Sequence, residues 1–231
     1  GVNSTADESA TNAGAAYVFV CNAEAWTQQA YLKPAAVGAA QVGDLFGVAV
    51  AIAGDTVIVG ANLEDSGTTE VNSTADESAT NAGAAYVFVR NAGAWTQQAY
   101  LKPAAVGTTQ GGDRFGVSVA ISGDTVVVGA WGEDSSTVGV NSTPDENAAD
   151  AGAAYVFVRS GSTWSQQAYL KASNTGSGDL FGWSVAVSGD TLVVGAYGEN
   201  SSTTGVNSTP DMSATNAGAA YVFVRNAGAW T

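Results

Sequence analysis

The stretch DRFGVSVAISGDTVVVGAWGED, from Asp113 to Asp134, decides the fold because the chain contains it three times. It returns as DLFGVAVAIAGDTVIVGANLED from Asp44 to Asp65 and as DLFGWSVAVSGDTLVVGAYGEN from Asp179 to Asn200. Near-identity at a fixed period indicates a repeat architecture, in which each unit is one supersecondary motif that buries its apolar surface against its neighbours. The internal structure of one copy therefore predicts the structure of the others.

Each copy reads as two short strands joined by a tight turn. Val117, Val119 and Ile121 alternate with small residues, and this period of two puts the branched side chains on one face of a strand. We predict a turn at 122–124 (SGD), because Gly tolerates positive φ and Asp can hydrogen bond to nearby amides. The unbroken apolar run at 126–128 (VVV) is typical of a strand that is covered on both faces.

The rest of each period adds two more strands. The motif VNST recurs with its Val at positions 2, 71, 140 and 206, which gives periods of 69, 69 and 66 residues. Each period also holds AGAAYVFV, starting at Ala13, Ala82, Ala151 and Ala217, and WTQQAYLK or WSQQAYLK, starting at Trp26, Trp95 and Trp164. No window has helical apolar spacing, and 29 Gly would weaken any long helix. We expect an all-β protein, a β-propeller of four-stranded antiparallel blades, with residues 1–231 as one tandem-repeat segment.

The chain holds about three and a half such blades. It starts with the last two strands of one blade, continues through two complete blades and ends in a blade whose fourth strand stops at 230–231. Closed propellers typically need four to eight blades, so this segment leaves blade faces and strand edges bare. We expect either that a second copy completes the assembly, as a dimer or a filament, or that the chain is a window on a longer tandem array.

The pairing of Phe-Gly with a later Gly-Ala makes the repeat specific. The residues are Phe46, Gly47, Gly60, Ala61, Phe115, Gly116, Gly129, Ala130, Phe181, Gly182, Gly195 and Ala196. This unit resembles the FG-GAP repeats that form the blades of the integrin α-subunit β-propeller. More narrowly, it is similar to the tandem FG-GAP repeats of large secreted or surface-exposed bacterial proteins. The resemblance covers essentially the whole chain, and it implies an extracellular or cell-surface module with a structural or adhesive role.

Two departures from the family pattern matter. The family's final Pro is replaced by Asn62, Trp131 and Tyr197. Blades of the integrin type also carry a calcium loop, DxDxDGxxD, between their first two strands, and here that loop has shrunk to 53–55 (AGD) and its equivalents. A hard cation takes six to eight oxygen ligands, which one Asp per turn cannot supply. We therefore do not expect the family's calcium site at these turns. The Phe residues are predicted to wedge between adjacent blades as core packing.

A second place for calcium is the acidic loop of about twenty residues between the second and third strands. The carboxylates and amide concerned are Glu64, Asp65, Asp76, Glu77, Glu133, Asp134, Asp145, Glu146, Asn147 and Asp150, with Asp7 and Glu8 in the first period. Oxygen ligands suit calcium, whereas the absence of His and the single Cys argue against zinc or copper sites. No spacing matches a known calcium loop, so a solvated acidic loop is the simpler interpretation. The alternative function is a calcium-dependent carbohydrate-binding or ion-binding module.

The same loops contain N-glycosylation patterns. Asn-Ser-Thr occurs at Asn3, Asn72, Asn141 and Asn207 in loops that we expect to be exposed. Pro144 and Pro210 follow two of these triplets directly and should reduce acceptance there. Such triplets also arise readily in loops rich in Asn, Ser and Thr, so the pattern is a hypothesis rather than an assignment.

The composition of the chain argues against two classes of binding partner. Seven Lys+Arg against 21 Asp+Glu give a formal charge of −14, which repels nucleic acids and anionic membranes. No apolar run is long enough to span a bilayer. We expect the partners to be copies of the chain itself or an extracellular protein or carbohydrate.

Catalysis has little support in the sequence. There is no His to act as a base, and the acidic residues recur at equivalent places in every repeat, which is typical of a scaffold. We predict that the protein is not an enzyme. The lone Cys21 stands where the other repeats have Arg90, Arg159 and Arg225, and it is either a neutral substitution or the site of an intermolecular disulfide.

Overall fold

The computed structural model describes residues 1–5, 9–35, 41–104, 107 and 110–231, and every regular element in them is a β-strand. Three antiparallel sheets have four strands each and one has two. The strands are β1 (Ala16–Asn22), β2 (Ala25–Leu32), β3 (Val50–Ala53), β4 (Thr56–Ala61), β5 (Ala84–Asn91), β6 (Ala94–Leu101), β7 (Ser118–Ser122), β8 (Thr125–Ala130), β9 (Ala153–Ser160), β10 (Thr163–Leu170), β11 (Phe181–Ser188), β12 (Thr191–Ala196), β13 (Ala219–Asn226) and β14 (Ala229–Trp230).

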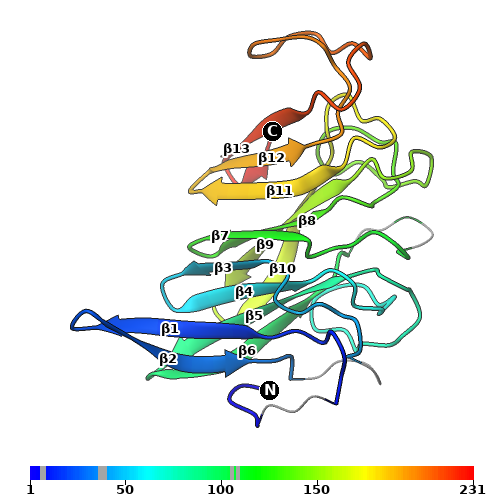
Figure 1. The fold of residues 1–231 in the computed structure, drawn as a ribbon. Coiled ribbons are helices and arrows are strands. Elements are labelled where there is room, and N and C mark those ends of the chain that lie inside the picture. Colours follow the sequence, from blue (N-terminus) through cyan, green and yellow to red (C-terminus); the bar gives the residue numbers. More distant parts are fainter. Residues whose placement is uncertain (6–8, 36–40, 105–106, 108–109) are drawn as a thin grey trace.

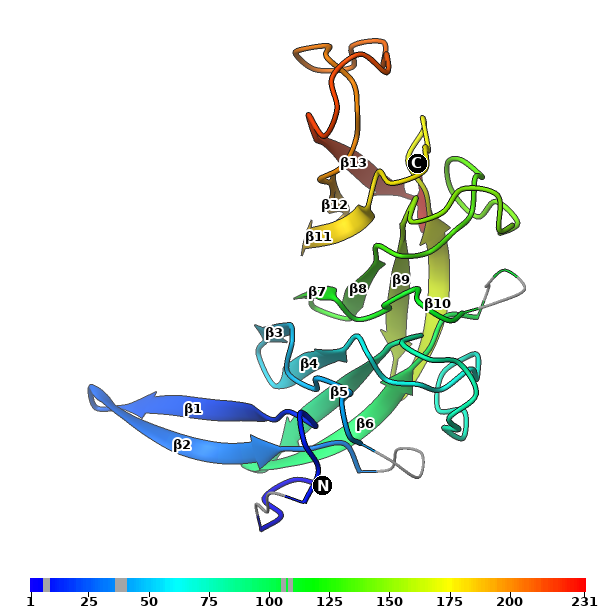
Figure 2. The same cartoon turned by 45° about the vertical axis from the view of Figure 1, so that its right-hand side comes forward.

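The sheets follow one another as propeller blades. We number them in chain order: the first blade is the pair β1–β2, and the second, third and fourth are β3–β6, β7–β10 and β11–β14. The blades fan out so that β3, β7 and β11 lie along one side of the row and the outer strands β6 and β10 along the other (Figure 2). The termini lie at opposite ends of the row (Figure 1). The prediction of about three and a half four-stranded blades is confirmed.

The two ends of the strands carry different connections. The short hairpin turns, such as those joining β3 to β4 and β7 to β8, lie on the left in Figure 1, and the long loops between second and third strands lie on the right. We call these sides the turn face and the loop face. In the third blade Ser122 pairs with Thr125 around the predicted turn, and Gly123 has a φ of 57°. The predicted hairpin is therefore confirmed.

The apolar core lies between blades. Ile58 and Val87 of the second blade form one buried cluster with Phe115 and Tyr155 of the third blade. The neighbouring Val57 instead joins the cluster shared with the first blade. The second strand of a blade is thus covered on both faces, as its unbroken apolar run predicts. The ring centroids of Phe115 and Tyr155 lie 5.4 Å apart in an edge contact, and burying a Phe side chain contributes about 1.5–3 kcal/mol.

The glycines of the repeat allow the backbones of adjacent blades to meet. Gly83 of the second blade forms a parallel bridge with Phe115 of the third, and the Phe115 N–H donates to the Ala82 carbonyl at 2.9 Å. A Cβ at Gly129 would collide with the carbonyl oxygen of Gly182 in the fourth blade. Close backbone approach is a reason for Gly inside a strand, so these positions are steric requirements of blade packing.

We expect Gly129→Ala to destabilise the protein severely, by more than about 3 kcal/mol, because the new methyl group would force two blades apart. The matched control is Gly123→Ala, where a Cβ would meet nothing within 4 Å and the positive φ alone costs roughly 1 kcal/mol. Thermal unfolding followed by circular dichroism measures both. Equal losses in the two variants would contradict the steric role of Gly129.

Candidate functional site

The second and third blades each hold a buried ion pair at the base of the long loop. Lys102 is fully buried, and its Nζ lies 3.2 Å from Glu64 Oε2 and 2.6 Å from the Gly83 carbonyl oxygen. The Tyr100 hydroxyl donates to Glu64 Oε1 at 3.0 Å. Lys171, Glu133 and Tyr169 repeat the arrangement in the third blade, with an ion pair of 2.6 Å. Removing one partner of a buried pair leaves an uncompensated charge, so Glu64 and Glu133 serve the structure here.

The loop aspartates predicted as metal ligands accept hydrogen bonds from their own loops. Asp76 Oδ1 accepts from the Gly67 N–H at 2.9 Å and from the Ser78 hydroxyl at 2.8 Å, and these bonds lower the pKa of Asp76. Asp145 accepts from the Ser136 N–H at 2.7 Å, which lowers the pKa of Asp145 to about 2. Both carboxylates therefore hold the loop backbone in place.

Two further predicted ligands, Asp65 and Asp134, hold the other end of the loop. Asp65 Oδ1 accepts from the Asn81 N–H at 2.7 Å, and Asp134 Oδ1 accepts from the Asp150 N–H at 2.8 Å. Among the residues that the structure describes, no three Asp, Glu or Cys side chains gather as a cation site. The aspartates of one loop thus accept hydrogen bonds from different backbone groups of that loop. Calcium binding stays a prediction, and Asp7 and Glu8 lie outside the described residues.

The Asn-Ser-Thr residues have a structural use as well. Asn72 has a φ of 59°, and its Oδ1 accepts from the Tyr100 N–H at 2.9 Å while its own N–H donates to the Tyr100 carbonyl at 2.8 Å. Asn141 makes the same two contacts with Tyr169. All four predicted acceptor residues are exposed: Asn3, Asn72, Asn141 and Asn207. Asn is well suited to this left-handed position, which explains its recurrence, and glycosylation stays a prediction.

A buried carboxyl precedes each Phe-Gly pair. Burial, together with the neighbouring Glu133, Glu146 and Asp134, raises the pKa of Asp113 to about 8, and Lys102 opposes the shift. The pKa of Asp44 is raised to about 7, again mainly by burial. Burial also raises the pKa of Asp179. These carboxyls form part of the base of the loop face, where carboxylates crowd together.

The raised pKa predicts how stability depends on pH. A carboxyl at position 113 keeps its proton up to about pH 8 in the folded state but loses it near 3.8 in the unfolded chain. The folded state binds more protons between these values, so the free energy of unfolding falls as pH rises from about 4 to about 8. We expect Asp113→Asn to flatten this dependence in calorimetry and to raise the melting temperature at pH 8.5 by about 3 °C or more.

The variant Asp44→Asn should behave in the same way at the second blade, and the double variant should be flatter still. A wild-type melting temperature that rises between pH 5 and pH 8, or parallel curves for wild type and Asp113→Asn, would contradict the prediction.

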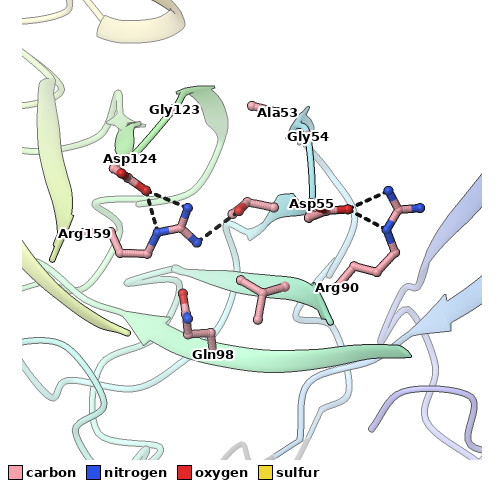
Figure 3. Close-up of a pocket in the computed structure, with 10 residues that line it drawn as sticks. Ala53, Gly54, Asp55, Arg90, Gln98, Gly123, Asp124 and Arg159 are labelled. Atoms are coloured by element: carbon pink, nitrogen blue, oxygen red, sulfur yellow. Dashed lines mark hydrogen bonds and ion pairs between the residues drawn. The ribbon is translucent and has the colours of Figure 1, made fainter. Parts of the chain in front are cut away.

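The turn face carries a row of Asp–Arg pairs that sequence reasoning missed. A groove of about 580 Å³ opens between the second and third blades (Figure 3). In it the Arg159 Nη2 and the Asp124 Oδ1 lie 2.6 Å apart, and the Arg90 Nη2 lies equally far from Asp55 Oδ1. Exposed pairs contribute at most about 1 kcal/mol. The available signal was that Asp and Arg recur 35 residues apart in three repeats.

The same arginines lock each blade to the one before it. The Arg159 Nη1 donates to Thr56 Oγ1 of the preceding blade at 3.1 Å, and its guanidinium lies 5.2 Å from the Trp164 ring centroid. The Trp164 Nε1 donates to Gln98 Oε1, also of the preceding blade, at 2.7 Å. Arg225 and Trp230 repeat both contacts with Thr125 and Gln167. The groove is therefore the outside of a blade junction whose charges are already paired within the chain.

Comparison with known proteins identifies the family. The family model described as FG-GAP repeat matches residues 26–88, 95–157 and 164–223, which is more than half of the chain. The chain belongs to the FG-GAP repeat family, as its motifs predict. FG-GAP repeats are typical of extracellular and surface proteins, and their propellers are a non-enzymatic kind of module. No curated protein matches the chain. The described residues contain no helix that is long and apolar enough to cross a bilayer.

Proposed function

We propose that this protein is an extracellular structural and adhesive module that presents its loop face to partners and joins further copies of itself through the faces of its outermost blades. The observation that supports this function is the exposure, at each end of the row, of side chains whose equivalents are buried between blades inside the chain. The ordered loops suit presentation, because their carboxylates and hydroxyls hold the loop backbone in a defined shape.

The face at the N-terminal end is aromatic. Tyr17 and Trp26 on the first blade are 55% and 71% exposed, whereas Tyr86 and Trp95, their equivalents on the second blade, are 0% and 5% exposed. Phe19 is exposed in the same way. Inside the chain these positions pack against the preceding blade, whereas on the first blade they are uncovered. Contiguous exposed apolar surface of this kind marks an interaction site.

The face at the C-terminal end is aliphatic and complementary. Val222 on the fourth blade is 62% exposed, whereas the equivalent Val87 is fully buried against Phe115 and its neighbours on the next blade. Val193 and Val224 are also exposed. The two end faces are therefore the two halves of one interface that the chain already forms internally. A second copy that uses it joins head to tail, and such contacts give rings or filaments.

The end blades do not merge in this assembly. β1 and β13 hold the same place in their blades, because both carry the YVFV motif and pair with the strand that follows them, β2 and β14. The first blade of one copy would therefore stack on the fourth blade of the next as a separate blade. The contact area then resembles an internal junction without the inner strands of one blade.

Restoring the missing arginine should tighten this contact. Cys21 replaces the arginine that elsewhere stacks on Trp and donates to a Thr of the preceding blade, and Thr191 is the corresponding exposed Thr on the fourth blade. One recovered hydrogen bond to a charged donor is worth roughly 1.5 kcal/mol, so we expect Cys21→Arg to lower the dissociation constant about tenfold. Cys21→Ser is the matched control and should not tighten the contact.

Light scattering after size exclusion, over a concentration series with reductant, measures the association. We expect Val222→Asp to weaken it, because a charge would be buried in the contact. EDTA should leave the mass unchanged, whereas an assembly that falls apart only in EDTA would favour the calcium-dependent module. A monomer at all concentrations for wild type and Cys21→Arg would refute self-association through the end faces.

A further inference from the structure

Three aromatic rings form a continuous row at the loop-face end of the inner strands. Trp131 follows β8, Trp183 lies near the start of β11, and Tyr197 follows β12. The ring centroids of Trp131 and Trp183 are 5.7 Å apart, and those of Trp183 and Tyr197 are 5.2 Å apart, with planes tilted by 42° and 41°. We call this set the aromatic row. It joins the third blade to the fourth.

Two rings of the aromatic row are exposed, and among the described blades the row occurs once. Trp183 is 45% exposed and Tyr197 is 57% exposed. The equivalent of Trp183 is Val48 in the second blade and Val117 in the third, and the equivalent of Tyr197 in the second blade is Asn62. The ion pairs and loop aspartates recur from blade to blade, so they are needed by the fold. The aromatic rings occur at only one of the described blade junctions, so the fold of the other junctions does not need them.

The cation Arg114 stands at one end of the aromatic row. The Arg114 guanidinium lies 5.0 Å from the Trp131 ring centroid. Its equivalents are Leu45 and Leu180, so this charge is also particular to the third blade. Among the described residues, the ion pairs of Arg use Arg90, Arg159 and Arg225, and Arg114 pairs with no carboxylate. Its fork of N–H donors is thus available to hydroxyl groups of a ligand.

We propose that the aromatic row binds a β-1,4-linked oligosaccharide, with successive pyranose rings lying on Trp183 and Tyr197 and with hydroxyl groups of the chain accepting hydrogen bonds from Arg114. Aromatic faces carry negative charge in their quadrupole and attract the C–H groups that line the faces of such sugars. The ring centroids follow one another at 5.7 and 5.2 Å, which suits the successive units of an extended chain. Nucleobases stack too, but the formal charge of −14 repels a phosphate backbone.

This site is separate from the contact proposed for self-association. Inside the chain Trp183 comes to lie beside Trp131 because it belongs to the inner strand of the following blade. The first blade consists of β1 and β2 alone, which are equivalent to the third and fourth strands of a complete blade. The two proposals therefore use different residues: the aromatic row uses Trp183 and Tyr197, whereas the contact proposed for self-association uses Val222 on the fourth blade and Tyr17 and Trp26 on the first.

The test is titration calorimetry of the full chain with cellohexaose and with chitohexaose in EDTA, together with tryptophan fluorescence. We expect binding of at least one probe in the presence of EDTA. The variants Trp183→Val and Tyr197→Asn carry the residues that this protein itself has at equivalent positions, so both should fold. Each should weaken binding at least tenfold. Trp26→Val removes an exposed Trp of the first blade and is the matched control: it should weaken self-association and leave sugar binding unchanged.

Three results would overturn the proposal. The first is no binding of either probe by the wild-type chain at roughly 5 mM, which would place the dissociation constant well above about 1 mM. The second is sugar binding that Trp183→Val and Tyr197→Asn leave intact, which would move the site away from the aromatic row, or binding that occurs only when EDTA is left out, which would move it to the acidic loops. The third is binding of decaproline that depends on Trp183 without binding of either sugar, which would make the row a peptide site.

Discussion

The structure depends on one backbone contact, the parallel bridge between a glycine of one blade and the phenylalanine that opens the next. Gly83 meets Phe115 in this way, and Gly14 and Gly152 do the same at the other junctions. Behind the bridge, Lys102 donates to the Gly83 carbonyl while it is paired with Glu64. A buried ion pair is stable only when its remaining hydrogen-bonding groups are satisfied. The ion pair therefore holds the backbone at Gly83, against which the following blade packs.

The family repeat and the blade are out of phase by one strand. The match at residues 26–88 begins with the fourth strand of the first blade and ends with the third strand of the second. Each sequence unit thus ties two blades together covalently, while the apolar clusters tie the same blades by packing. Stability in such an array is approximately a sum of unit and neighbour terms. Each inner blade carries apolar side chains on both faces and is covered by a neighbour on both. The outer face of an end blade has the same side chains, so they are exposed.

What recurs in every blade and what occurs once have different meanings. The Asp–Arg pairs, the loop aspartates and the Asn of Asn-Ser-Thr recur because blade geometry needs them. The aromatic row and Arg114 break the repeat, and nothing in the packing of the other junctions requires them. Cys21 also breaks it, at the edge of an end face, where it removes a lock that the internal junctions have. Functional hypotheses are best attached to such departures.

The sequence by itself determined the strands, the turns, the blade and the wedging phenylalanines, because these follow from a period of two and from turn residues that act within a few positions. It could not assign the acidic residues, because Glu64 finds Lys102 across 38 positions and the loop aspartates bind backbone groups that no spacing reveals. Only the tertiary structure brought Trp131, Trp183 and Tyr197 into one row. Which side chains meet across a blade junction depends on how the sheets stack, and stacking is a property of the whole chain.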